Sequence, residues 1–161
     1  MKRESIRHTV VGGLMLLLAG CGEPPPPAPP LPAAPPPPSV SMAPPGQDAV
    51  GKQFNPPPPG LAAVYFFNPT TFGPAIAVGV GPMVIGSLAP LSWMRVELSP
   101  GWHAIRCMAI GSVNPTSIML APGDTRFVAI ELPPGAPLCT IQETAWTIGR
   151  AGVLAGNRAM Q

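Results

Sequence analysis

The chain has 161 residues, of which 46% are hydrophobic and only 10% are charged, and its formal net charge is +2. Three of the nine basic residues and one of the seven acidic residues fall within the first seven positions, so the rest of the chain carries six of each sign. Scattered arginines without a net positive charge exclude the basic clusters on which nucleic-acid binding depends. The low charged fraction favours association with a partner.

Residues 1–20 have the layout of a secretory signal peptide, with a basic start followed by a hydrophobic run over 10–19. That run is shorter than the roughly 20 apolar residues that a membrane-spanning helix needs. The sequence LAGC then ends at Cys21 and resembles the bacterial lipobox, in which a lipid is attached to the cysteine thiol and cleavage makes that cysteine the first residue. The alternative, a buried helix that ends at an incidental cysteine, leaves the basic start unexplained.

Lipidation of Cys21 predicts a protein that is anchored to a membrane without spanning it. Each buried acyl methylene contributes about 0.8 kcal/mol, and stable attachment takes more than one chain. The resemblance to bacterial lipoproteins implies three chains on this cysteine. Gly22 follows it, where an aspartate tends to hold lipoproteins of enteric-type bacteria in the inner membrane. The resemblance therefore implies an outer-membrane lipoprotein that faces the periplasm.

Residues 21–59 are predicted to be a disordered, lipid-anchored, proline-rich linker. This region holds 17 of the 27 prolines, and such tracts adopt polyproline II, which rises about 3.1 Å per residue. The sequence at 47–54 contains no proline and is expected to soften the spacer. A proline-rich ligand for an aromatic groove is the alternative interpretation.

Residues 60–161 are predicted to form one all-β domain, a small antiparallel β-sandwich. Glycine and proline turns separate short β-prone runs, which predict strands at 61–67, 76–80, 83–88, 91–98, 102–110, 116–120, 126–132 and 138–148. In the fourth run, Met94, Val96 and Leu98 alternate with Arg95 and Glu97, which indicates one core face. A short helix in 149–160 is expected to pack Val153 and Leu154 on a sheet edge, although its interior glycines weaken it.

The order of motifs in this domain resembles a family of small bacterial lipoproteins that is defined only as a domain of unknown function. The segments that carry the resemblance are VYFF, IAVGVGPMVIGSL, VELSPGWHAI and SIMLAPGDTRFVAI. The best-matching positions are Gly86, Pro100, Gly101, His103 and Gly123. The chain has Gly81 and Pro82 where that family has an Asp-Gly turn. Similar turns occur in the PEGA-type surface modules, which are also small β-sandwiches, and the resemblance implies no enzyme, cofactor or catalytic residue.

No catalytic or metal-binding site is predicted from the residues. No G-x-S-x-G elbow is present. His103 is the one histidine outside the signal segment, and its ring is expected to hydrogen-bond a neighbouring carbonyl. Cys107 and Cys139 form either a disulfide, as an oxidising compartment favours, or two separate buried thiols. Together with His103 they would give only three metal ligands without a CxxC spacing, which is weak support for a metal site.

Trp93, Arg95 and His103 are the candidate interaction surface. By strand parity, Trp93 shares a face with Arg95, and an exposed tryptophan beside an arginine is typical of binding hot spots. The alternative is that Trp93 covers the second face of a sandwich strand or packs under the carboxy-terminal tail.

Two functions remain after the sequence has been considered. The favoured one is a non-enzymatic envelope module without a cofactor, which displays its sandwich on the spacer and binds an envelope protein in the periplasm. The alternative is a carrier of a small apolar ligand or lipid, whose sandwich interior opens to admit the guest. A hydrolase would need a carboxylate pair that the sequence does not place together.

Overall fold

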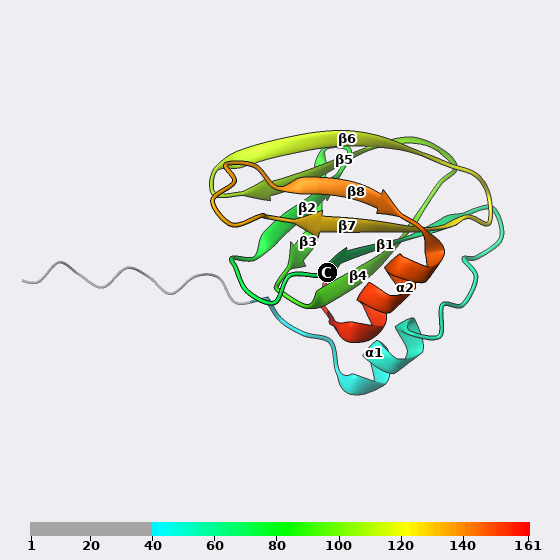
Figure 1. Cartoon of the computed structure of the whole chain (residues 1–161). Helices are drawn as coiled ribbons and strands as arrows, with labels where there is room; N and C mark the ends of the chain where they lie inside the picture. The colour runs from blue at the N-terminus through cyan, green and yellow to red at the C-terminus, as the bar shows by residue number, and fades with distance from the viewer. Residues whose placement is uncertain (1–39) are drawn as a thin grey trace, which may run out of the picture. The chain divides into compact units, whose positions relative to one another are not determined.

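A computed structural model describes residues 40–161, which form a two-sheet β-sandwich with two short helices (Figure 1). This architecture confirms the predicted fold class. The predicted signal peptide, the lipidation site Cys21 and the proline tract that ends at residue 38 lie outside the described residues. Within the described part of the chain, neither helix is long and apolar enough to cross a membrane.

The first sheet has five strands and is mixed rather than wholly antiparallel. Its order is β8 (Thr140–Thr144), β7 (Thr125–Glu131), β1 (Ala62–Asn68), β4 (Ser92–Leu98) and β9 (Asn157–Arg158). The pairs β1–β7 and β4–β9 are parallel, and the other neighbours are antiparallel. The central strand β1 is buried along its whole length, as expected for a strand that is covered on both faces.

The second sheet has four strands, all paired antiparallel. Its order is β3 (Met83–Leu88), β2 (Ile76–Val80), β5 (Gly101–Ala109) and β6 (Ser112–Leu120). Strand β6 begins four residues before its predicted start. The sequence suggested a later start because Asn114 and Pro115 resemble a turn, but the structure includes both residues in the strand. A proline is compatible with this position because β6 is an edge strand and needs no second ladder partner.

Two clusters of apolar side chains lie on opposite faces of the five-stranded sheet. The inner cluster fills the space between the sheets and includes Val64, Phe66, Met94, Ile105 and Val128. The outer cluster lies beneath the helices and consists of Ala63, Tyr65, Phe67, Trp93, Phe127, Ala129 and Val153, with Phe54 packed against it. The alternation in β4 therefore separates two buried faces, and not a core face from a solvent face.

Helix α1 (Pro45–Gly51) corrects the predicted boundary at residue 60. Residues 40–161 belong to one compact unit, so the domain begins well before residue 60. Pro45 occupies the first turn of the helix, where its missing N–H costs nothing. The helix packs so closely that a side-chain carbon added at Gly51 would overlap the indole of Trp93.

Residues 41–43 fix the same segment to the end of the domain. Met42 and Ala159 form an antiparallel bridge. The Ala43 N–H donates to the Arg158 carbonyl at 2.7 Å, and the Met160 N–H donates to the Ser41 carbonyl at 2.8 Å. The second half of the predicted linker is therefore part of the folded domain.

The predicted final strand, 138–148, was too long, and the predicted helix began too late. Strand β8 ends at Thr144, and α2 (Trp146–Ala155) follows. The helix packs on the outer face of β1 and β7, not on a sheet edge, with Val153 buried and Leu154 49% exposed. Side chains added at Gly149 and Gly152 would overlap Phe127 and Phe67. Two glycines that weaken an isolated helix thus allow this one to lie close to the sheet.

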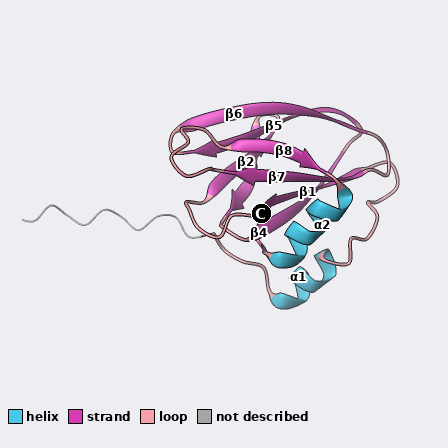
Figure 2. Ribbon diagram, viewed as in Figure 1, coloured by secondary structure: helices cyan, strands magenta, loops and turns pink. Residues whose placement is uncertain are grey.

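Figure 2 shows both helices on the same side of the sandwich, against the five-stranded sheet. No helix among residues 40–161 covers the outer face of the four-stranded sheet. This difference between the two outer faces positions the candidate site.

Candidate functional site

The structure does not assemble the predicted surface of Trp93, Arg95 and His103. Trp93 is fully buried, which contradicts its prediction as an exposed binding residue and agrees with the alternative that it covers the second face of a strand. Its indole N–H donates to Asp48 Oδ1 at 3.1 Å, and the same oxygen accepts the Arg158 backbone N–H at 2.7 Å. Trp93 therefore holds α1 against the sheet.

Arg95 is also committed to contacts within the domain. Its guanidinium lies 3.2 Å from Glu97 Oε1, donates to the Asn55 carbonyl at 3.3 Å, and lies 5.7 Å from the ring centre of Tyr65. The Tyr65 hydroxyl donates a hydrogen bond to the Gly51 carbonyl at 3.1 Å. Burial is the main cause that raises the pKa of Tyr65. These contacts hold residues 51–55, before β1, against the five-stranded sheet. The role of Arg95 in the domain is therefore structural.

His103 lies at the start of β5, in the other sheet. Its Nε2 is 2.7 Å from the Ser99 carbonyl oxygen, so Nε2 carries the hydrogen in this contact because a carbonyl can only accept. This is the hydrogen bond to a neighbouring carbonyl that the sequence predicted. The histidine joins neither Trp93 nor Arg95 in a shared surface.

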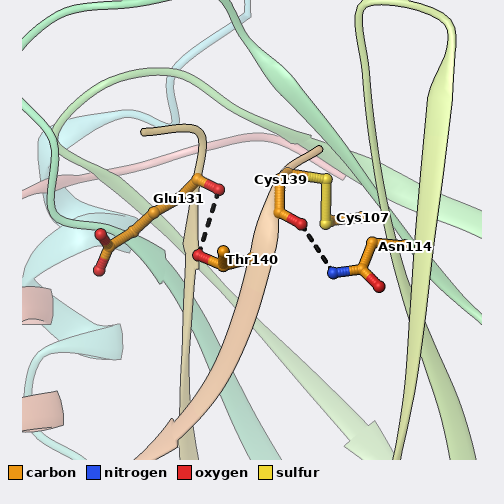
Figure 3. Close-up of a disulfide and its surroundings, with 5 residues drawn as sticks. All are labelled: Cys107, Asn114, Glu131, Cys139 and Thr140. Carbon is orange, nitrogen blue, oxygen red and sulfur yellow. Dashed lines mark hydrogen bonds between the residues drawn. A yellow bond between two sulfur atoms is a disulfide. The ribbon is translucent and has the colours of Figure 1, made fainter. Parts of the chain in front are cut away.

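Cys107 and Cys139 form a disulfide with a Cα–Cα distance of 6.1 Å (Figure 3). The bond connects β5 in one sheet to the residue before β8 in the other. Asn114 Nδ2 donates to the Cys139 carbonyl at 2.8 Å, which adds a second link between the sheets. Two sulfurs joined in this way are not thiolate ligands, and no group of three metal-ligating side chains occurs in residues 40–161.

Two carboxylates at the first sheet meet around Arg126. Asp124 and Glu143 approach one another only through Arg126, at 2.9 and 2.8 Å. Hydrogen bonds from the Ala121 N–H and from Arg126 lower the pKa of Asp124, so this group is ionised at neutral pH. A general acid needs the opposite shift. Because Arg126 is 41% exposed, the cluster is a surface ion-pair network.

The strongest candidate surface is the outer face of the four-stranded sheet, which the helices leave uncovered. We call it the open face and define it by the outward-facing side chains of β5 and β6: Trp102, Ala104, Arg106, Met108, Val113, Pro115, Ser117 and Met119. The alternate residues Ile105, Cys107 and Ile118 point into the inner cluster. Cross-strand pairing aligns Trp102 with Met119 and Met108 with Val113, so the apolar side chains are neighbours across the strands.

Exposure of large apolar side chains distinguishes the open face from an ordinary sheet surface. Trp102 is 73% exposed, and Val113 and Met119 are each 52% exposed. At the end of the β5–β6 hairpin, Ile110 is 76% exposed and lines a hollow of about 270 Å³ with Phe72 and a proline-containing loop. Apolar patches of this kind mark interaction sites on soluble domains.

Arg106 is the one Lys, Arg, Asp or Glu in the four strands of this sheet. It is paired with Gly79 on β2 and with Pro115 on β6. A side-chain carbon built on Gly79 would lie 3.1 Å from Arg106 Nη2, so the guanidinium rests on the space that this glycine leaves. Arg106 Nε and Nη2 are buried and have no hydrogen-bond partner within the described chain.

No family model and no curated protein matches this chain. The resemblance to the lipoprotein family of unknown function stays a prediction.

The exposed tryptophan of the structure is Trp102 in β5, whereas the candidate surface predicted from the sequence contains Trp93 in β4, which is buried. The signal for the correct strand is present in the sequence, because Trp102 has the opposite strand parity to the apolar residues Ile105 and Cys107. What the sequence did not reveal was which sheet face the helices cover.

Proposed function

We propose that this protein is a non-enzymatic bacterial envelope lipoprotein, acyl-anchored at Cys21, that presents the open face to a protein partner in the periplasm. The observation that supports the binding role is the uncovered apolar strip of β5 and β6, with Trp102 73% exposed at one end. Tryptophan and methionine are enriched at protein interfaces, and arginine and tryptophan dominate their hot spots. The lipobox and the basic, then hydrophobic, start of the chain support the anchor.

The folded position of α1 shortens the proposed spacer. With residues 40–59 attached to the domain, the spacer consists of residues 22–39. Polyproline II rises about 3.1 Å per residue, so 18 residues reach roughly 56 Å from the membrane. The partner is therefore expected to be accessible within that distance of the anchor.

We do not propose the carrier function. A carrier of this fold would need room for a guest between the sheets, and side chains of the inner cluster occupy that space. The Cys107–Cys139 disulfide also ties the two sheets together, which opposes their separation.

The test of the proposed function combines fractionation with crosslinking in cells. A carboxy-terminally tagged chain is expected to incorporate a labelled fatty acid and to fractionate with the outer membrane, whereas the Cys21→Ser variant should lose both properties. Chemical crosslinking of the full chain should capture a specific envelope protein, and deletion of residues 23–39 with Cys21 retained should reduce that capture. Labelling that persists in Cys21→Ser would refute the anchor, and co-purification of lipid without a protein adduct would favour the carrier.

A further inference from the structure

Building on the proposed function, we propose that the partner of the open face is an envelope protein whose docking surface is itself apolar and presents a carboxylate to Arg106. Two independent features of the four-stranded sheet support this inference. One is the charge of the open face, and the other is the backbone of the hairpin that ends it.

The charge of the open face has one sign. The carboxylates of residues 40–161 are Asp48, Glu97, Asp124, Glu131 and Glu143, and none of them lies in β2, β3, β5 or β6. Arg106 therefore stands alone in an apolar strip, without an acidic neighbour in its own sheet. A partner that covered this strip without supplying an anion would bury an unpaired charge, which is strongly unfavourable.

Arg106 is already partly desolvated in the free domain. Nε and Nη2 are shielded from water without a hydrogen bond, while Nη1 is not among the shielded atoms and remains available to a partner. The position of the guanidinium above Gly79 limits its freedom, so little side-chain entropy is lost on binding. A carboxylate that meets Nη1 forms a charge-assisted hydrogen bond, the stronger class of such bonds.

The hairpin tip supplies the second feature. Ile110 has a backbone φ of +50° and is followed by Gly111 at +76°, which is the pattern of a two-residue hairpin turn that favours Asn-Gly. A β-branched side chain is an outlier in this left-handed region. Ile110 nevertheless stands there, 76% exposed. Strained residues of this kind concentrate at functional sites, and Ile110 stands at the tip of the hairpin whose strands carry the open face.

The same observations favour a protein over two other occupants. Membrane-surface binding draws on clusters of basic residues, and the open face has a single arginine. A second copy of this chain, docked open face to open face, would bring Arg106 without a carboxylate to meet it. A protein surface with one acidic residue satisfies both the apolar strip and the charge.

The experiment places a photo-crosslinking amino acid at Ser117 of the full lipidated chain in its native cells. Ser117 is exposed and pairs with Ala104 at the centre of the open face. Thr147, which is exposed on α2 on the opposite side of the sandwich, is the matched control position. Mass spectrometry then identifies the adduct and the partner residues beside the crosslink.

We expect a specific envelope-protein adduct from Ser117 and none from Thr147. Arg106→Glu should reduce the adduct at least tenfold, while Arg106→Lys should retain more of it. Replacement of the partner carboxylate nearest the crosslink by arginine should restore the adduct in Arg106→Glu cells. Ile110→Asn should raise the Tm of the domain by roughly 2–5 °C and yet lower the adduct yield, a combination that a folding defect cannot produce.

The outcomes separate this inference from the proposed function. If a protein adduct forms from Ser117 but Arg106→Glu leaves it unchanged, the carboxylate is refuted while the protein-binding role stands. If Ser117 labels lipid, a second copy of the chain or its own proline-rich segment, the inferred occupant is wrong. If the envelope protein is captured from Thr147 instead, the open face is not the docking surface and both proposals lose their structural basis.

Discussion

Asp48 provides the sharpest test of whether residues 40–59 belong to the fold. Its Oδ1 accepts hydrogen bonds from the Trp93 indole and from the Arg158 backbone, and its Oδ2 lies 2.7 Å from Lys52 Nζ. Asp48→Ala leaves two largely buried donors without an acceptor. Hydrogen bonds to charged groups contribute about 1.5–3 kcal/mol each. Since the Asp48 side chain is 18% exposed and water can replace part of the loss, we expect a destabilisation of about 3 kcal/mol.

Two further variants calibrate that value. Asp48→Asn keeps an oxygen acceptor and loses only the charge, so its cost should be about 1 kcal/mol. Lys52→Ala removes an ion pair between partly exposed groups and should cost about 0.5 kcal/mol. The assay is urea unfolding of a soluble form that carries Cys21→Ser, followed by tryptophan fluorescence and circular dichroism. If Asp48→Ala costs no more than Lys52→Ala, α1 does not stabilise the sandwich and the domain begins near residue 60.

Three other predictions concern the disulfide, the helix glycines and acid stability. Cys107→Ser with Cys139→Ser should destabilise the fold by about 3.5 kcal/mol, because the bond closes a loop with a sequence separation of 32; equal denaturation midpoints with and without reductant in the parent protein would contradict this. Gly149→Ala should destabilise the domain because the added side chain would overlap Phe127. Gly46→Ala in α1, where nothing lies within 4 Å of the added carbon, should stabilise the domain by up to about 1 kcal/mol. If thermal melts rank the two variants the other way, α2 does not pack closely on the sheet. The folded state lowers the pKa of Asp124 below its ordinary 3.8. The ionised Asp124 therefore stabilises the fold above about pH 4, and this stabilisation is lost as the pH falls through the lower folded pKa. The free energy of unfolding should then depend less steeply on acid pH in Asp124→Asn, and an equally steep dependence would show that Asp124 does not contribute to acid unfolding.

The strands were largely predictable from sequence because their signals are local. Glycine and proline turns bound each run, and β2 and β3 have the predicted bounds. The end of the chain was harder, since Gly149 and Gly152 reduce helix propensity in isolation and become favourable only when Phe127 and Phe67 lie beneath them. No local pattern contains that information.

The candidate site was less predictable than the fold. Strand parity correctly separated Trp93 from Met94 and Val96, but parity alone does not distinguish an exposed face from one that a distant helix covers. The helix that covers Trp93 comes from a segment between proline tracts and is fixed through Asp48, which is 45 residues away in sequence. Exposure of the open face follows from the same arrangement, because α1 and α2 both pack on the other sheet.

The contact between Asp48 and Arg158 also determines when the domain can be completed. This contact joins positions 110 residues apart. The second edge of β1 is likewise paired only after β7 has formed, because β7 is its parallel neighbour. Long-range pairings of this kind are slow to form because a large loop must close before they stabilise the chain. While the chain is being synthesised, α1 therefore lacks this anchor beside the outer cluster until residues 157–160 have been made. A chain that stops before β9 would therefore leave α1 without its backbone partners.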